Sequence, residues 1–251
     1  MNATLVVDIG NTSTLLAVAR GLKLSSIQRM PSAEPALKLR AVPKRAVIAS
    51  VKPGVNTRWE RVLKKQGVVE ILWVNAFVDL GIPVSYPKPG DIGADRLANA
   101  CEAAATYGAP VVVCDFGTAL TFDIVKKREG YVGGIICPGL PLMFDYLAEK
   151  TALLPHIKPA KTTHVIGKST EEAMRIGAHL GYQGMVNGIL AELKKELGRD
   201  TQVCATGGFA QWVFQGPCLA EASSQRPGET PVPIDPHLTL KGLARIGQLN
   251  S

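Results

Sequence analysis

The chain has 251 residues, of which 46% are hydrophobic and 20% charged, a balance typical of a globular protein with one large core or two smaller ones. No apolar run approaches the ~18 residues of a membrane span, and the run before Asp8 is too short for a signal peptide, so we expect a cytoplasmic protein without a membrane partner. The net charge of +7 is dispersed in short basic clusters, which argues against nucleic-acid binding, and five cysteines without a Cys-x-x-Cys pair argue against disulfides and zinc.

The first half of the chain predicts strands followed by helices. The apolar run 5–7 ends in Asp-Ile-Gly-Asn-Thr at residues 8–12, and two further strand-like segments follow up to about residue 30. The pattern then predicts, in order, a buried strand (46–51), a plain turn (52–54), a helix (58–66), a strand (68–74), a loop rich in Pro and Gly (81–91) and a helix (95–107) that Gly108 ends.

The second half begins like the first. The apolar run 111–114 ends in Asp-Phe-Gly-Thr at residues 115–118, and two further strand-like segments lead to a glycine turn at 139. Ser169 and Glu172 have the spacing of a capping box and predict the start of a helix. The remaining pattern predicts a second helix (183–197), a strand (203–205), a proline-rich loop (215–236) and a closing helix (240–248). The repeat indicates a duplicated α/β architecture.

The repeated Asp-x-Gly turn has a chemistry suited to phosphate. Glycine lets the backbone approach a ligand closely, and turn amides with a Thr hydroxyl can surround phosphate oxygens. The carboxylates of Asp8 and Asp115 can bind a cation that bridges those oxygens. A single Asp before Gly most often forms only an Asx turn, but two copies in equivalent positions favour a phosphate and cation site.

A second candidate site lies where the loop 81–91 becomes a helix, at residues 93–96. Asp95 is either the helix N-cap or a general base for a substrate hydroxyl, with Arg96 holding an acidic group, and the spacing alone does not decide. The segment 166–170 lacks the first glycine of a P-loop, so we interpret it as a loop and helix cap. Thr-Gly-Gly at residues 206–208 favours an ordinary turn, although it permits an adenine or ribose to approach.

Taken together, these motifs resemble those of the type III pantothenate kinases, within the superfamily of acetate kinase, sugar kinases, heat-shock ATPases and actin. The similarity also includes the segments 48–51, 133–139, 166–170, 206–208 and 238–243. It implies an α/β fold with two duplicated ribonuclease H-like (actin-like ATPase) domains around a central cleft, over residues 1–109 and 110–251. It further implies phosphorylation of the 4′-hydroxyl of pantothenate by ATP, the first step of coenzyme A biosynthesis.

The resemblance also implies roles for individual residues. Asp95 is expected to be the catalytic proton acceptor, and Asp115 to bind a monovalent cation, K⁺ or NH₄⁺. Residues expected to bind ATP, with Mg²⁺, are Asp8, Ile9, Gly10, Asn11, Thr12, Ser13, Thr14, Leu15 and Thr118. Residues expected to bind pantothenate are Tyr86, Gly93, Ala94, Asp95, Arg96 and Thr170. The family pattern further implies a homodimer whose interface lies in the C-terminal domain.

Two alternatives remain open at this point. One is a phosphotransferase or phosphatase of the same superfamily that acts on a different acid or sugar, against which the motif at 93–96 argues. The other is a regulatory binding protein on an ATPase-like scaffold, against which the presence of both Asp95 and Asp115 argues. The loop 215–236 is longer and richer in proline than the family pattern, which bears on nucleotide affinity more than on the type of reaction.

Overall fold

A computed structural model describes residues 3–160, 164–215 and 231–251. Its contacts divide the chain into two compact units: Met1–Val111, Asp123–Gly133 and His237–Ser251 form the first, and Val112–Phe122 with Gly134–Pro236 the second. These units do not coincide with the sequence halves 1–109 and 110–251, because the C-terminal helix and the end of one hairpin pack with the N-terminal segment. Most of the proline-rich loop expected over 215–236 lies outside the described residues.

The first unit is built on a five-stranded mixed sheet. Its strands are β1 (Thr4–Ile9), β2 (Ser13–Arg20), β3 (Lys23–Pro31), β4 (Arg45–Ser50) and β5 (Glu70–Trp73), in the order β3-β2-β1-β4-β5. The central strand β1 pairs antiparallel with β2 and parallel with β4, which places Asp8 opposite both Leu15 and Ala49. The carboxyl end of β1, where the first Asp-x-Gly motif lies, is therefore held from both sides.

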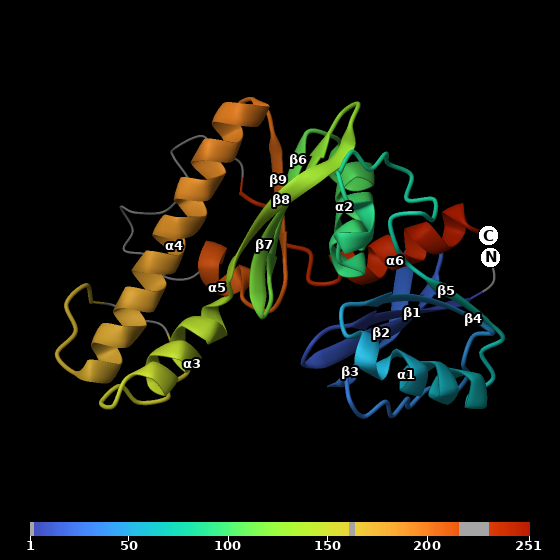
Figure 1. Cartoon of the computed structure of the whole chain (residues 1–251), viewed down its shortest axis with the longest axis horizontal. Coiled ribbons are helices and arrows are strands. Elements are labelled where there is room, and N and C mark those ends of the chain that lie inside the picture. Colours follow the sequence, from blue (N-terminus) through green and yellow to red (C-terminus); the bar gives the residue numbers. More distant parts are fainter. Residues whose placement is uncertain (1–2, 161–163, 216–230) are drawn as a thin grey trace. The chain divides into compact units, whose positions relative to one another are not determined.

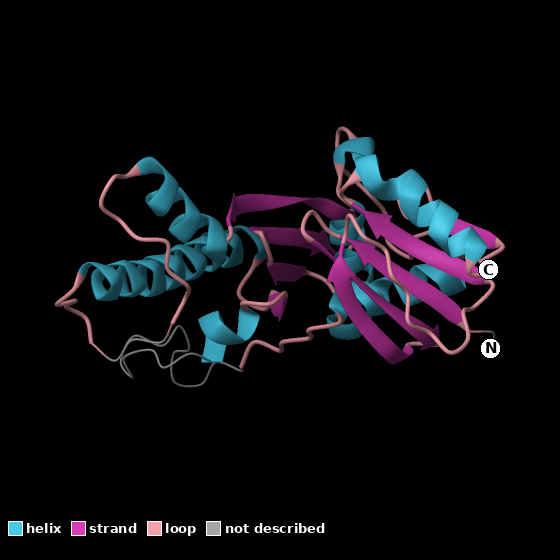
Figure 2. Ribbon diagram, turned by 90° about the horizontal axis from the view of Figure 1, so that it is seen from below, coloured by secondary structure: helices cyan, strands magenta, loops and turns pink. Residues whose placement is uncertain are grey.

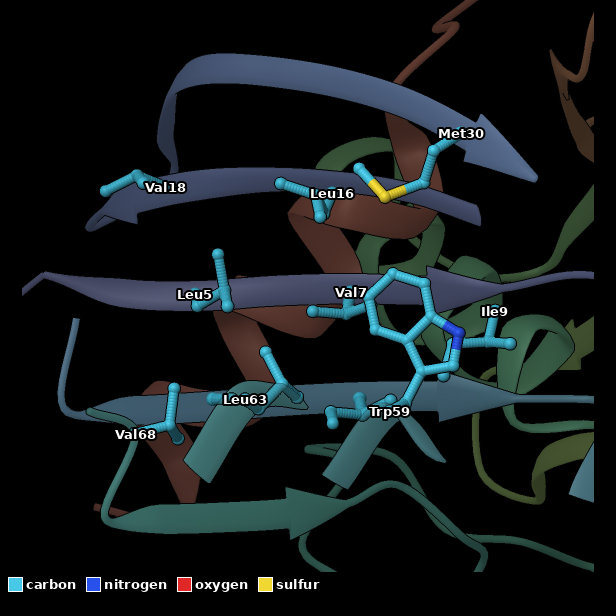
Figure 3. Packing of buried hydrophobic residues seen from close by; sticks show 11 residues of the cluster. Leu5, Val7, Ile9, Leu16, Val18, Met30, Trp59, Leu63 and Val68 are labelled. Carbon is cyan, nitrogen blue, oxygen red and sulfur yellow. The ribbon is translucent and has the colours of Figure 1, made fainter. Parts of the chain in front are cut away.

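Helices cover both faces of this sheet (Figure 1), with α1 (Pro53–Lys65) on one and α2 (Ala94–Tyr107) and α6 (Leu238–Leu249) on the other. Trp59 and Leu63 of α1 pack against the apolar side chains that β1, β2 and β4 present to that face (Figure 3). On the opposite face α6 crosses α2 so closely that a Cβ at Gly242 would lie 2.0 Å from the carbonyl oxygen of Ala98. Burial of β1 on both faces explains its continuous apolar run.

The second unit repeats this plan with a smaller sheet. The sheet consists of β6 (Val111–Phe116), β7 (Ala119–Lys126), β8 (Gly130–Pro138) and β9 (Gln202–Thr206), and its order β8-β7-β6-β9 matches β3-β2-β1-β4. The turn of the β7–β8 hairpin, from Asp123 to Gly133, belongs to the first unit. The helices are α3 (Leu140–Lys150), α4 (Thr170–Leu197) and α5 (Ala210–Gln215), of which α4 is the longest (Figure 2). The Phe116 ring packs against Tyr182 of α4 and Phe214 of α5. The predicted α/β class is confirmed, and the matching strand orders are those of a duplication.

Two predicted elements differ from the structure, and two helices were not predicted. The helix expected over 183–197 is the second part of the 28-residue helix α4, whose middle glycines weaken the apolar periodicity but meet no atoms that would break the helix. The turn expected at 52–54 is the start of α1, where Pro53 is tolerated because the first helical N–H needs no partner. The segments that form α3 and α5 were not predicted as helices. Among the described residues, no helix is long and apolar enough to cross a membrane.

Candidate functional site

The first candidate phosphate loop connects β1 to β2 in the first unit. The Gly10 N–H donates to the carbonyl oxygen of Ser13 (3.2 Å), a turn with Asn11 and Thr12 exposed at its tip. A Cβ at Gly10 would lie 2.9 Å from that oxygen, so the turn requires glycine. Asp8, half-buried at the end of β1, adds a carboxylate beside the exposed amides. This combination can bind phosphate oxygens and a cation that neutralises them.

The loop is fixed from the protein interior by Ser32, a fully buried residue that follows β3. The Ser32 hydroxyl donates to the Gly10 carbonyl oxygen (2.7 Å) and lies 3.0 Å from the hydroxyl of Thr14. The Ser32 N–H donates to the carbonyl oxygen of Thr12 (3.1 Å), and the indole N–H of Trp59 donates to the carbonyl oxygen of Ser32 (2.9 Å). Since Trp59 belongs to the core of α1, this core positions the phosphate loop.

Two basic side chains contact the same loop from outside. Lys52 Nζ donates to the carbonyl oxygen of Asn11 (2.7 Å), and Arg29 Nη1 donates to the Ser13 hydroxyl (2.9 Å). Their charges favour an anion at the loop as well as holding its backbone in place. Ile9 and Thr14, by contrast, are fully buried, so they support the loop from the core.

The second candidate site lies at the start of α2, also in the first unit. The N-cap is Gly93 rather than Asp95, which lies in the first helical turn and accepts a hydrogen bond from the Arg96 N–H through Oδ1 (2.8 Å). The N-cap interpretation of Asp95 is therefore wrong. A Cβ at Gly93 would lie 2.6 Å from Asp95 Oδ1 and 3.4 Å from Val51 Cγ1, so glycine makes room for the carboxylate.

The same contacts join the two candidate sites of the first unit. The Val51 N–H donates to the carbonyl oxygen of Ile9 (3.0 Å), while its side chain touches the position of Gly93. Burial raises the pKa of the Asp95 carboxyl group above its ordinary value, against the opposing effects of the Arg96 N–H and charge. A carboxylate with a raised pKa is a better proton acceptor, which is the property a general base needs.

Arg96 is held by a buried carboxylate that sequence reasoning assigned no role. Its Nε donates to Asp123 Oδ1 (2.7 Å), and the hydroxyl of Tyr131 donates to the same oxygen (2.9 Å). Asp123 is fully buried and Tyr131 is 1% exposed. Tyr86, from the Pro- and Gly-rich loop, completes the group, since its ring meets that of Tyr131 edge to face at 6.3 Å.

In the second unit, the turn between β6 and β7 carries the second Asp-x-Gly motif. The Gly117 N–H donates to the carbonyl oxygen of Ala119 (3.1 Å), so Thr118 alone forms the tip of this tighter turn. A Cβ at Gly139 would lie 2.1 Å from the Thr118 carbonyl oxygen, and one at Gly207 would lie 2.6 Å from Asp115 Oδ1. The turn is therefore packed between the start of α3 and the Thr-Gly-Gly segment, both of which need glycine there.

Two candidates remain: Thr170, which lies elsewhere in the second unit, and a metal site. Thr170 is exposed in the first turn of α4, behind the N-cap Ser169, whose hydroxyl accepts from the Glu172 N–H (3.2 Å) as the capping box predicts. Thr170 also borders an apolar pocket between α3 and α4. Among the described residues no group of three or more His, Cys, Asp or Glu side chains could hold a metal ion.

Sequence reasoning missed the roles of Ser32, Lys52, Asp123 and Tyr131 in positioning the loops, and it identified Gly139 only as a turn residue. One signal was available, because Asp123 is an acidic residue within the apolar run 119–125, where an unpaired charge would be costly. Ser32 and Lys52 carry no such signal, since serine and lysine near a strand end are ordinary surface residues.

Comparison with known proteins identifies the relatives of this chain. The sequence model of the type III pantothenate kinases matches residues 4–192. The type III pantothenate kinase of Methylacidiphilum infernorum is 39% identical over 253 residues, which cover 98% of this chain and 88% of that protein. Both matches include the two Asp-x-Gly turns and the start of α2, where the candidate sites lie.

Solved structures extend the similarity of the fold. A protein of Campylobacter jejuni described as a Baf family transcriptional activator superposes with a TM-score of 0.61 at 18% identity, covering 98% of each chain. A ROK family glucokinase of Streptomyces griseus, in complex with glucose and AMPPNP, has a TM-score of 0.52 at 14% identity, covering 97% of this chain and 98% of that one. At these identities the likeness establishes the actin-like ATPase fold alone.

Proposed function

The chain belongs to the type III pantothenate kinase family, and on that premise we propose which of its residues carry out the reaction. Its activity is the ATP-dependent phosphorylation of pantothenate at the 4′-hydroxyl, the first step of coenzyme A biosynthesis. Membership of the family decides against both alternatives, a kinase for another acid or sugar and a purely regulatory protein.

Asp95 is proposed as the proton acceptor. A primary alcohol is barely ionised near neutral pH, so its proton must pass to a base as its oxygen attacks. When the pantothenate oxygen bonds to the γ-phosphorus of ATP, the proton moves to the Asp95 carboxylate, and the bond to the β-phosphate oxygen breaks to release ADP. The observation that carries this role is the raised pKa of a carboxylate placed in the first turn of α2 beside Arg96.

Pantothenate binding is proposed for the residues around this carboxylate. Arg96 is suited to the substrate carboxylate because a guanidinium presents paired donors to two oxygens. Tyr86 is 38% exposed and its ring packs edge to face against Tyr131, so part of this residue remains accessible to a ligand. Gly93 and Ala94 bring the backbone of the helix start to the same place. Thr170, in the second unit, stays a prediction from the family pattern.

ATP binding is proposed for the first phosphate loop and for Thr118. Asp8 and Asp115 are suitable ligands for Mg²⁺ and a monovalent cation, because each is a carboxylate next to a glycine turn. When Mg²⁺ binds with ATP, it usually takes one or two protein carboxylates besides phosphate oxygens and water. When bound, these cations would supply charge that stabilises the phosphate oxygens during transfer. Asp115, whose carboxylate lies so close to Gly207 that a Cβ there would be 2.6 Å from its Oδ1, is proposed for the monovalent cation.

The assignment of Asp95 is tested with Asp95→Asn. Purified protein is assayed for pantothenate-dependent ADP release with MgATP and KCl, and 4′-phosphopantothenate is identified by mass spectrometry. We expect turnover to fall by roughly 100-fold or more, with an unchanged melting temperature, because the amide cannot accept the proton. Asp91→Asn is the matched control, since Asp91 is an exposed carboxylate in the same segment. Activity of Asp95→Asn close to that of wild type would remove Asp95 from this role.

The raised pKa of Asp95 also has a consequence for the pH dependence of wild-type turnover. The protonated carboxyl cannot act as a base, so kcat/KM should decline on the acid side at a pH above the ordinary range of aspartate. An acid limb that persists unchanged in the residual activity of Asp95→Asn would assign this limb to another group.

A homodimer is proposed through the second unit. Leu142 and Tyr146, 41% and 63% exposed, lie one turn apart on α3, and Leu153 beyond the helix is 90% exposed. Exposed apolar side chains on adjacent turns of one helix, as for Leu142 and Tyr146, are suited to a protein interface. Light scattering coupled to size exclusion should give a dimer mass for wild type and a monomer for Leu142→Glu/Tyr146→Glu. A monomeric wild type at micromolar concentration would contradict the proposal.

A further inference from the structure

Arg96 is oriented by a buried carboxylate on a different segment. The Nε–Asp123 Oδ1 distance of 2.7 Å joins α2 to strand β7, and Asp123 has no solvent exposure. Burial alone would lower the pKa of the guanidinium, but Asp123, Tyr131 and Asp95 together outweigh this effect and the pKa rises. The contact uses Nε, so the two terminal nitrogens of Arg96 are the ones that can pair with a ligand carboxylate.

Tyr131 fixes the other side of Asp123. Its hydroxyl donates to the carboxylate oxygen that Arg96 contacts, and its ring lies beneath the guanidinium, with 5.9 Å between Arg96 Cζ and the ring centroid. Burial and the neighbouring Asp123 charge both raise the pKa of Tyr131, so it remains a hydrogen-bond donor. Two contacts thus fix the guanidinium of Arg96: the hydrogen bond to the Asp123 carboxylate and the cation–π contact with the Tyr131 ring.

The loop that carries Tyr86 is attached to the same hairpin. The Tyr131 N–H donates to the carbonyl oxygen of Pro83 (2.9 Å), the Ser85 N–H donates to the carbonyl oxygen of Tyr131 (2.8 Å), and the Ser85 hydroxyl donates to the carbonyl oxygen of Glu129 (2.7 Å). Tyr131 therefore contacts both elements proposed to bind pantothenate, the loop that carries Tyr86 and the start of α2.

We propose that Asp123 and Tyr131 are positioning residues that aim the terminal nitrogens of Arg96 at the carboxylate of pantothenate, and so make the enzyme select an acid. This inference rests on the proposed function of Arg96. A buried ion pair adds little to stability compared with apolar packing, but it fixes the orientation of both side chains. For an arginine at a substrate site, a fixed orientation is the property that matters.

The test separates binding of the acid from catalysis. We expect Asp123→Asn to raise KM for pantothenate by about tenfold, because a charge-assisted contact contributes on the order of 1.4 kcal/mol, while KM for ATP stays within about twofold of wild type. Tyr131→Phe keeps the ring and removes only one hydrogen bond, so we expect a rise of about threefold and a normal melting temperature. This second variant decides the question if Asp123→Asn does not fold.

A second acceptor tests the selection of the acid. Pantothenyl alcohol keeps the reacting hydroxyl but has no carboxylate, so the variants should lose kcat/KM for pantothenate and retain it for the alcohol. In an Arg96→Ala background, Asp123→Asn should add no further loss for pantothenate, because its effect passes through Arg96. An equal loss for both acceptors in Tyr131→Phe, or an additive loss in the double variant, would overturn the inference.

Glu102→Gln provides the matched control. Glu102 is a buried carboxylate about two helical turns after Asp95 on the same helix, and it pairs with Arg245 of α6 at 2.8 Å rather than with Arg96. Its loss should lower the melting temperature without changing KM for pantothenate, and a rise in KM equal to that of Asp123→Asn would reduce both to structural effects. A wild-type protein that phosphorylates no pantothenate would instead overturn the proposed function and this inference with it.

Discussion

Gly139→Ala tests whether the close packing around the second Asp-x-Gly turn sets nucleotide binding. Gly139 has a φ of −70°, so alanine can adopt its backbone conformation and the variant perturbs only the available space. The new Cβ would lie 2.1 Å from the Thr118 carbonyl oxygen and 2.5 Å from that of Gly117. Since such contacts stay beyond 3.0 Å, the start of α3 and the turn must separate by about 1 Å.

That separation also breaks the hydrogen bond from the Gly139 N–H to the Thr118 carbonyl oxygen (3.0 Å). Overpacking of this kind costs about 1–3 kcal/mol, which for a chain of this size lowers the melting temperature by roughly 2–10 °C. If Thr118 contacts ATP, a displacement of about 1 Å should lower kcat/KM for ATP by as much as ~100-fold. The loss should appear in kcat/KM for ATP, whereas KM for pantothenate should change little.

The assay is ADP release at varied ATP and fixed saturating pantothenate, with thermal unfolding on the same samples. Gly188→Ala is the control in the same unit, because a Cβ at this exposed helical position meets no atom within 4 Å. It should keep full activity and raise stability by about 1 kcal/mol, the usual gain from glycine to alanine within a helix. Unchanged ATP kinetics and melting temperature in Gly139→Ala would refute the argument.

Two further predictions concern buried groups. His179 is 2% exposed and packs its ring against Trp212 at 4.6 Å, and this burial lowers its pKa. The folded protein therefore holds His179 neutral, whereas the unfolded chain binds a proton there below about pH 6.5, so stability should fall as the pH drops below that value. Denaturant titrations at several pH values should show this loss in wild type and a smaller one in His179→Phe, and equal losses in both would assign the effect elsewhere. Burial also raises the pKa of the Cys101 and Cys204 thiols to about 12, so iodoacetamide should modify them only after unfolding. Peptide mapping that finds either one modified in the native protein would contradict their burial.

The strand framework and the phosphate turns could be predicted because their causes are local. A buried strand that ends in Asp-x-Gly has a short apolar run, a polar end and a residue that needs no Cβ, all within a few positions. The glycine requirement at Gly10 arises from Ser13, three residues away, and the repeat at residue 115 supplied an independent second instance. The order of the strands in the two sheets then follows from the duplication.

The positioning residues could not be predicted because their partners lie far along the chain. Ser32 contacts Gly10 across 22 residues, and Arg96 contacts Asp123 across 27. The continuity of helix α4 was missed for a different reason. Its start after Ser169 and its second part over 183–197 were both predicted, but the glycines at 181 and 184 between them have low helix propensity. Local propensity describes such a segment poorly, because contacts with α3 and α5 decide whether it is helical.

The two turns show how a duplicated motif can acquire different tasks. In the first turn two exposed residues, Asn11 and Thr12, separate the hydrogen-bonded Gly10 and Ser13, and basic side chains reach the backbone. In the second, one residue forms the tip and glycines on two sides leave no room for a side chain. An open turn with cations nearby suits the mobile end of a polyphosphate, whereas a tight turn walled by backbone suits a group that must be held in a single position. Exchanging the turns should therefore abolish ATP turnover even though both copies keep the Asp-x-Gly pattern.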